Sequence, residues 1–176
     1  MSEDSEKSKS EATSYTAELE INWEYYGNFV GGDPDKLEIE VANDKCLVKK
    51  PGIYKLVSKD HLELYVGEGQ SVHKRLSDYK NARYELLKLR EGTNRRIQGW
   101  MLNLIKDEKG PIEIWVCTEA YIRHSDETKR KLDLDQRHNR LLIENLEISI
   151  TPNDFEIQNF SENWARNKNL KSINTE

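Results

Sequence analysis

Residues 52–75 read GIYKLVSKDHLELYVGEGQSVHKR, and this stretch decides the fold. Two short apolar runs, 53–57 and 62–66, are rich in β-branched and aromatic residues, as strands are. Four polar residues at 58–61 separate them, a length and composition typical of a hairpin loop. The stretch therefore predicts a β-hairpin, followed from about Ser71 by a helix.

Three parts of this stretch resemble the GIY-YIG nucleases in residue type, order and spacing. They are Gly52-Ile53-Tyr54, Tyr65-Val66-Gly67 and Arg75. The resemblance covers about residues 50–165. It implies an α+β fold (an α/β sandwich) in which a small, mainly antiparallel sheet is flanked by helices, and the activity of an endonuclease that hydrolyses DNA phosphodiester bonds.

Further positions extend the resemblance. Tyr79 follows Arg75 by one helical turn, so the two side chains share a face. Tyrosine at this place looks more like the restriction-type and phage-type branches of the family. Glu144, within Leu141–Asn145, is similar to the one metal-binding carboxylate of the family. The alternative for Glu144 is a surface glutamate on an amphipathic helix.

The family also often places an asparagine after this glutamate, in a segment that contains proline. Pro152 is present, and three asparagines compete for the role. Spacing favours Asn159, while Asn153 and Asn163 remain alternatives.

The resemblance implies a role for each of these residues. Glu144 would hold Mg²⁺ or Mn²⁺, Arg75 would bind the phosphate, and Tyr65 and Tyr79 would orient water or phosphate. Tyr54 would be the general base. A phenol with a pKa of about 10 is a poor base at pH 7, so we expect Lys55, Lys74 or Arg75 to lower the pKa of Tyr54. For each tyrosine taken alone, amphipathic core packing is an equal alternative.

The net charge of −5 hides a strong asymmetry along the chain. Residues 1–50 hold 12 acids and 6 Lys/Arg, whereas residues 74–106 hold nine Lys/Arg and three acids. A local cationic surface of this size suits a phosphate backbone, and its alternative is a solvated helix face. The predicted partner is double-stranded DNA, and its predicted contacts are Lys74, Lys80, Arg83, Arg95, Arg96, Gln98 and Asn103.

A helix is predicted after Thr93 or Asn94, with apolar residues at 97, 100, 101, 104 and 105. Arg95, Arg96, Gln98 and Asn103 are expected on its opposite face. Arg and Asn/Gln are the side chains that read guanine and adenine edges, so this helix is a candidate for base readout. The size of the chain and Tyr79 look more like the restriction and phage branches of the family, which implies a site-specific, restriction-like nuclease. A palindromic target would imply a homodimer. The alternatives are a repair or structure-directed nuclease and a non-catalytic DNA-binding module.

The rest of the chain is predicted as follows. Residues 1–17 form a disordered acidic and Ser-rich tail, residues 18–50 an N-terminal extension, residues 51–167 the nuclease domain, and residues 168–176 a C-terminal tail. Strands are expected at Leu37–Val41 and Ile112–Cys117, and a helix at Val72–Leu89. Another helix is expected to begin between Ser125 and Lys131, with one face made of Leu134, His138, Leu141, Leu142 and Asn145.

The sequence also disfavours several classes of protein. It has no apolar run long enough for a membrane span, no signal-like N-terminus and two cysteines without metal-ligand spacing, which favour a cytoplasmic chain. No Walker, zinc or Ser/His/Asp pattern is visible.

Overall fold

A computed structural model describes residues 16–32, 36–43, 49–58, 60, 62–81, 93–107, 110–124 and 128–159. Within these ranges the chain forms strands and helices in a mixed α+β order. The strands are β1 (Ala17–Ile21), β2 (Glu24–Gly31), β3 (Leu37–Val41), β4 (Gly52–Ser58), β5 (Glu63–Gly69), β6 (Ile112–Cys117), β7 (Ala120–His124), β8 (Lys129–Lys131) and β9 (Glu156–Ile157). The helices are α1 (Val72–Asn81), α2 (Thr93–Lys106) and α3 (Arg137–Ile150).

The main sheet has six strands in the order β3-β2-β6-β4-β5-β9. Its pairs are antiparallel except β5 with β9, which are parallel. The predicted hairpin is β4 and β5, with Gly52 opposite Gly69 and Ser58 opposite Glu63. The predicted mainly antiparallel sheet is therefore confirmed, as are the strands β3 and β6.

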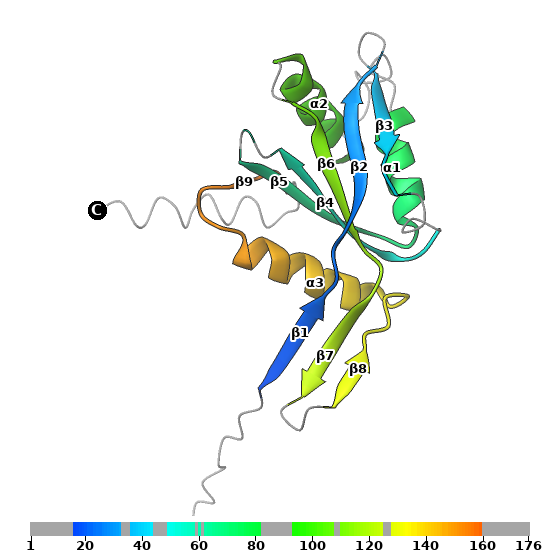
Figure 1. Cartoon of the computed structure of the whole chain (residues 1–176), viewed down its shortest axis with the longest axis vertical. Helices are drawn as coiled ribbons and strands as arrows, with labels where there is room; N and C mark the ends of the chain where they lie inside the picture. Colours follow the sequence, from blue (N-terminus) through cyan, green and yellow to red (C-terminus); the bar gives the residue numbers. More distant parts are fainter. Residues whose placement is uncertain are drawn as a thin grey trace, which may run out of the picture.

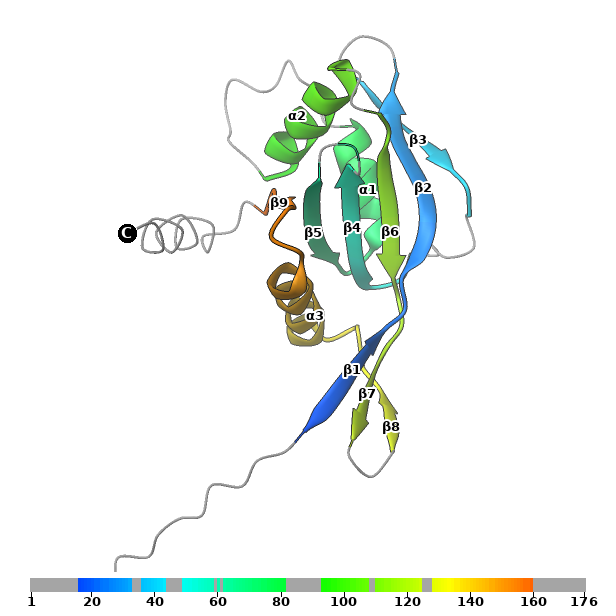
Figure 2. The ribbon, with the colours of Figure 1, turned by 60° about the vertical axis from the view of Figure 1, so that its left-hand side comes forward.

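Helices cover both faces of this sheet (Figures 1 and 2). One core lies under α1 and α2 and includes Tyr54, Leu76 and Met101, each at most 1% exposed. The other lies under α3 and includes Ile53 and Ile143, both 0% exposed. Alternate residues of β4 thus enter different cores, because successive side chains of a strand point to opposite faces. The result is the expected sheet flanked by helices.

A second sheet of three strands, in the order β1-β7-β8, extends away from the main body (Figure 1). It corrects the expectation of a helix beginning between Ser125 and Lys131. Residues 129–131 are strand β8, and the helix begins at Arg137. The expected helix face is also wrong, since Leu142 is 51% exposed whereas Arg140, Ile143 and Glu147 are buried. Backbone pairing with β7 decides the state of this polar segment, and polarity alone did not reveal it.

Residues 18–50 contribute to the main sheet, because β2 pairs with both β3 and β6. The division of the chain at residue 50 stays a prediction. The predicted helix at Val72–Leu89 is present as α1 to Asn81, and its remainder lies outside the described residues, as do both tails. Among the described helices, none combines the length and apolar character needed to cross a membrane.

Candidate active site

The β4–β5 hairpin presents two of the predicted tyrosines on the face covered by α1 and α2. Tyr54 is 0% exposed and Tyr65 is 5% exposed. Their ring centroids lie 6.1 Å apart. Lys55, the next residue after Tyr54, points to the opposite face, where its Nζ donates to Glu147. The strand alternation therefore separates Lys55 from the tyrosines.

Helix α1 begins directly after the hairpin and brings Arg75 and Tyr79 to the same place. The hydroxyl oxygens of Tyr79 and Tyr54 lie 2.5 Å apart in a buried hydrogen bond. The guanidinium carbon of Arg75 lies 6.0 Å from the centroid of the Tyr79 ring. The Arg75 Nε is buried without a hydrogen-bond partner among the described residues. A buried, unsatisfied cationic donor is costly, and an anionic ligand would satisfy it.

Asn159 joins the outer edge of β5 to helix α3. Its Oδ1 accepts from the Val66 N–H at 2.9 Å, and its Nδ2 donates to the Val66 carbonyl oxygen at 2.7 Å. The same Nδ2 lies 3.4 Å from Glu144 Oε1. Of the three predicted asparagines, Asn159 thus lies beside Glu144, Asn153 is exposed in a turn, and Asn163 lies outside the described residues.

The site straddles the edge of β5. Backbone pairing with β9 reaches only Glu63 and Leu64, so among the described residues no strand covers this edge beyond Leu64. Tyr65 lies on one face of the strand, Asn159 sits at the edge, and Glu144 approaches from the helix on the other face. The predicted residues of five chain segments are therefore brought together.

The tyrosines of this cluster are protonated at neutral pH. Burial is the main cause that raises the pKa of Tyr54 well above its usual value, and the nearby Tyr79 and Tyr65 raise it further. Burial likewise raises the pKa values of Tyr65 and Tyr79. Arg75 lowers the pKa of Tyr54, but by less than burial raises it. Arg75 thus acts in the expected direction, but the pKa of Tyr54 is raised overall, because desolvation of the phenolate is the larger effect.

Two carboxylates lie near each other at the open side of the site. Burial, and after it the negative charge of Glu68, raise the pKa of Glu144 to about 7, while Arg137 and Arg75 act in the opposite direction. The sequence did not single out Glu68, whose only signal was its place between Gly67 and Gly69. Burial and a neighbouring carboxylate both disfavour the charged form of Glu144. A bound cation would stabilise that charged form.

The described residues contain no group of three or more His, Cys, Asp or Glu that could hold a metal. A zinc site or an all-protein calcium cage therefore does not fit the described part of the chain. Mg²⁺ keeps several waters and binds through one or two carboxylates plus phosphate oxygens. Glu144 fits that requirement.

The predicted DNA contacts are distributed over two helices. Lys74 and Lys80 are exposed on α1, and Arg96 and Asn103 are exposed on α2. Gln98 corrects the sequence expectation, because it is only 1% exposed. At 100° per residue its direction falls between those of Met101 and Leu102, which are both buried, so it faces the core. Arg95 is partly buried, and Arg83 lies outside the described residues.

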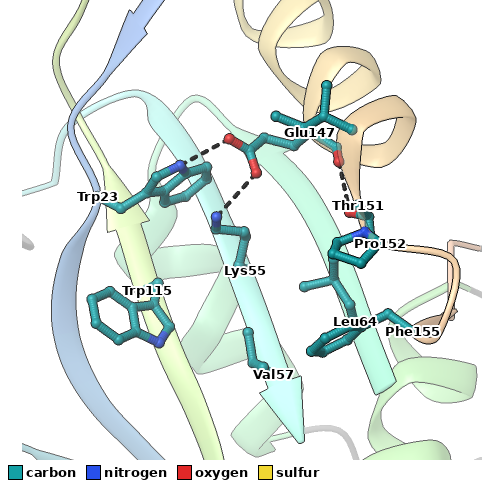
Figure 3. A pocket seen from close by; sticks show the side chains of 10 residues that line it. Trp23, Lys55, Val57, Leu64, Trp115, Glu147, Thr151, Pro152 and Phe155 are labelled. Atoms are coloured by element: carbon teal, nitrogen blue, oxygen red, sulfur yellow. Dashed lines mark hydrogen bonds and ion pairs between the residues drawn. The ribbon is translucent and has the colours of Figure 1, made fainter. Parts of the chain in front are cut away.

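A cavity of about 450 Å³ lies on the α3 face of the sheet and is lined by residues of β4, β5, β6 and α3 (Figure 3). Trp23, Trp115 and Phe155 are among its apolar lining. Glu147 joins the lining, where its two oxygens accept from Trp23 Nε1 and Lys55 Nζ, each at 3.0 Å. Its lining shares no residue with the tyrosine cluster.

No protein-family model and no curated protein matches the sequence. A solved structure, restriction endonuclease HPY188I in complex with product DNA, is similar to this chain with a TM-score of 0.42 and 15% identity. The match covers 74% of this chain and 76% of that chain. A likeness of this extent assigns neither a family nor an activity.

Proposed function

We propose that this chain is a metal-dependent DNA endonuclease of the GIY-YIG type, with restriction-like site specificity. The observation that carries the proposal is the gathering of Tyr54, Tyr65, Arg75, Tyr79, Glu144 and Asn159 around one edge of β5. These residues were selected from sequence resemblance alone. Tyr54, Tyr65 and Tyr79 belong to the core under α1 and α2, and beyond Leu64 no strand of the described residues covers the β5 edge.

In this proposal Glu144 holds Mg²⁺ or Mn²⁺, which when bound neutralises charge that develops on the phosphoryl oxygens. Asn159 keeps the Glu144 carboxylate beside the strand. Arg75 supplies a fixed cation whose donors match phosphate geometry. Lys74, Lys80 and Arg96 extend the cationic surface along the DNA backbone.

The tyrosines act first as hydrogen-bond donors, because their phenols are protonated. Tyr65 and Tyr79 orient the attacking water or a phosphate oxygen. Tyr54 accepts the proton of that water only when its own proton is lost, which its raised pKa makes rare at pH 7. A base with a high pKa is strong but scarce, so the proposed enzyme is slow at neutral pH and faster as the pH rises.

Supercoiled plasmid tests the activity. Incubation with Mg²⁺ or Mn²⁺ should give nicked and linear products, and chelation should stop the reaction. A Glu144→Gln variant should bind the same DNA and leave it intact, because phosphate contacts carry most of the affinity. Absence of cleavage by the intact chain across a range of DNA substrates with either ion would refute the proposal.

Mapping the ends on several linear DNAs tests the specificity. Discrete bands with a shared motif support the restriction-like proposal. Cutting confined to branched or damaged substrates would replace it with a repair or structure-directed role. Binding without any cutting would replace it with a non-catalytic DNA-binding module.

A further inference from the structure

Helix α3 turns three charged side chains toward the sheet. Arg140, Glu144 and Glu147 follow one another at spacings of four and three, so they lie on one helix face. Arg140 is only 3% exposed and Glu147 only 8%. Charged residues are almost never buried to this degree unless they are paired.

Arg140 is held on one side of Glu144. Its Nε donates to Glu68 Oε2 at 2.8 Å, and its Nη1 donates to the carbonyl oxygens of Leu134 and Asp135 at 2.6 and 3.0 Å. Glu68 belongs to β5, while the two carbonyls belong to the turn before α3. Arg140 therefore ties the start of α3 to the strand that carries Tyr65.

Glu147 lies on the other side of Glu144 along α3, and Figure 3 shows the two partners that hold it, Lys55 and Trp23. It accepts from Lys55 Nζ and from Trp23 Nε1, each at 3.0 Å. The Lys55 ammonium also lies 4.0 Å from the centroid of the Trp23 ring. Lys55 is the neighbour of Tyr54 on β4, so this pair ties the end of α3 to the strand of the proposed base.

The two pairs have opposite polarity. The helix supplies the cation near its start and the anion near its end, so an α3 turned end for end would face like charges. Arg137 already donates to Glu68 Oε1 at 3.2 Å, and a slide of three residues would bring Arg137 and Glu144 into the places of Arg140 and Glu147. It would also put Arg140 where Ile143 is now, fully buried in the apolar core. The two ion pairs and the burial of Ile143 are therefore satisfied together at one position of α3 along the sheet.

We propose that Arg140 and Glu147 are positioning residues, whose ion pairs with Glu68 and Lys55 hold α3 on both sides of Glu144 and direct its carboxylate to the β5 edge. The expected effect of these residues on metal binding rests on the proposed function. A buried ion pair is weak evidence for stability, and in some proteins it fixes one packing arrangement, which is the role proposed for these pairs. Mutation of a residue that orients a metal ligand typically lowers metal affinity by about 10–100-fold.

The test compares Arg140→Met and Glu147→Gln with Arg140→Lys and with Lys131→Met. Lys131 is a control, because its Nζ lies 2.6 Å from Glu119 Oε1 in an exposed pair that involves no residue of α3. Three quantities are measured on the intact chain: Mn²⁺ affinity by electron paramagnetic resonance, DNA affinity, and the side-chain amide resonances of Asn159. The Asn159 resonances report the Glu144 contact without metal or turnover.

We expect Arg140→Met and Glu147→Gln to weaken Mn²⁺ binding by roughly tenfold or more, to shift the Asn159 side-chain resonances, and to leave DNA affinity within about twofold, since phosphate contacts carry that affinity. Arg140→Lys should recover part of the loss, and Lys131→Met should match the wild type. If Arg140→Met does not fold, Glu147→Gln and Arg140→Lys decide.

Two negative results have different meanings. Wild-type protein that neither binds Mn²⁺ nor cuts DNA refutes the proposed function, and the Asn159 resonances then still decide whether the pairs position Glu144. Folded variants with unchanged Mn²⁺ affinity and unchanged Asn159 resonances overturn the positioning role.

Discussion

Gly67 lies directly opposite Tyr54 in the hairpin, and the Tyr54 hydroxyl occupies the space that a side chain at residue 67 would need. A Cβ on Gly67 would come within 2.4 Å of that hydroxyl oxygen and within 2.9 Å of the Tyr65 ring. The last glycine of the Tyr65-Val66-Gly67 motif therefore allows both phenols to lie against the strand.

Gly67→Ala should lower the free energy of unfolding by about 1–3 kcal/mol, the usual cost of overpacking a core, and should abolish plasmid cleavage. Gly99→Ala is the matched control, since a Cβ there would meet nothing within 4 Å. In helix α2 that change should stabilise the protein by about 0.5–1 kcal/mol. Chemical denaturation of both variants checks the pair, and a Gly67→Ala protein as stable and active as wild type would contradict the packing argument.

The raised pKa of Tyr54 predicts the pH dependence of cleavage. Below its pKa, the fraction of ionised base rises tenfold per pH unit, so the single-turnover rate should keep rising through about pH 9 without a plateau. Tyr54→Phe should lower the rate by about 10²-fold or more and remove this dependence. A Phe variant that keeps the wild-type slope would show that another group sets the profile.

Glu144 is predicted to reduce stability in the absence of metal. Its pKa is raised from 4.5 to about 7 on folding, chiefly by burial, so the folded chain binds the proton more tightly than the unfolded chain. The resulting penalty is absent below pH 4.5, grows between pH 4.5 and about 7, and is complete above that. In chelator, Glu144→Gln should therefore raise the melting temperature at pH 8 and change it little at pH 5. Calorimetry at both values checks this, and an equal effect at both would exclude the carboxylate charge as its cause.

Asn159 is expected to matter for both stability and activity. Asn159→Ala leaves the Val66 N–H and carbonyl without their side-chain partner and should lower the free energy of unfolding by about 1–3 kcal/mol. Asn153→Ala, at an exposed turn, should stay within about 0.5 kcal/mol of wild type. A larger loss for Asn153 than for Asn159 in denaturant titrations would reverse this assignment.

Arg96 tests base reading by helix α2. If it contacts a base edge, Arg96→Ala should cost about 1–3 kcal/mol of discrimination at one position of the target. If it binds only phosphate, the variant should weaken binding to all sequences alike and lower the salt dependence. Binding measurements on single-base variants of the mapped target, at two salt concentrations, separate these outcomes.

The elements with strong local signals were predictable. The β4–β5 hairpin follows from two β-rich runs and a polar loop, and α2 from its apolar spacing. The position of strand β2 is harder to predict, because its place beside β6 depends on pairing between residues far apart in the chain. Strand β8 could not be predicted, because its three exposed residues, Lys129–Lys131, are all charged and carry no apolar alternation.

The members of the candidate site could be selected from the sequence, but their electrostatics could not. Arg140 and Glu147 look like solvent-facing charges on a helix until their partners on β5 and β4 are known. The pKa of Tyr54 likewise depends on complete burial, which its neighbours in sequence do not reveal. The burial of Gln98 is not evident from the sequence, because a polar residue beside an apolar helix face is usually exposed.

The Asn159 amide also bears on self-association. An unpaired strand edge is a template on which another chain can add a strand. At Val66 both groups that such a strand would use are already bonded to one side chain. At this position the side-chain amide of Asn159 therefore takes the place of a neighbouring strand. Among the described residues, the β5 edge beyond Leu64 therefore has no free backbone pair at Val66 to which a second copy of the chain could bond.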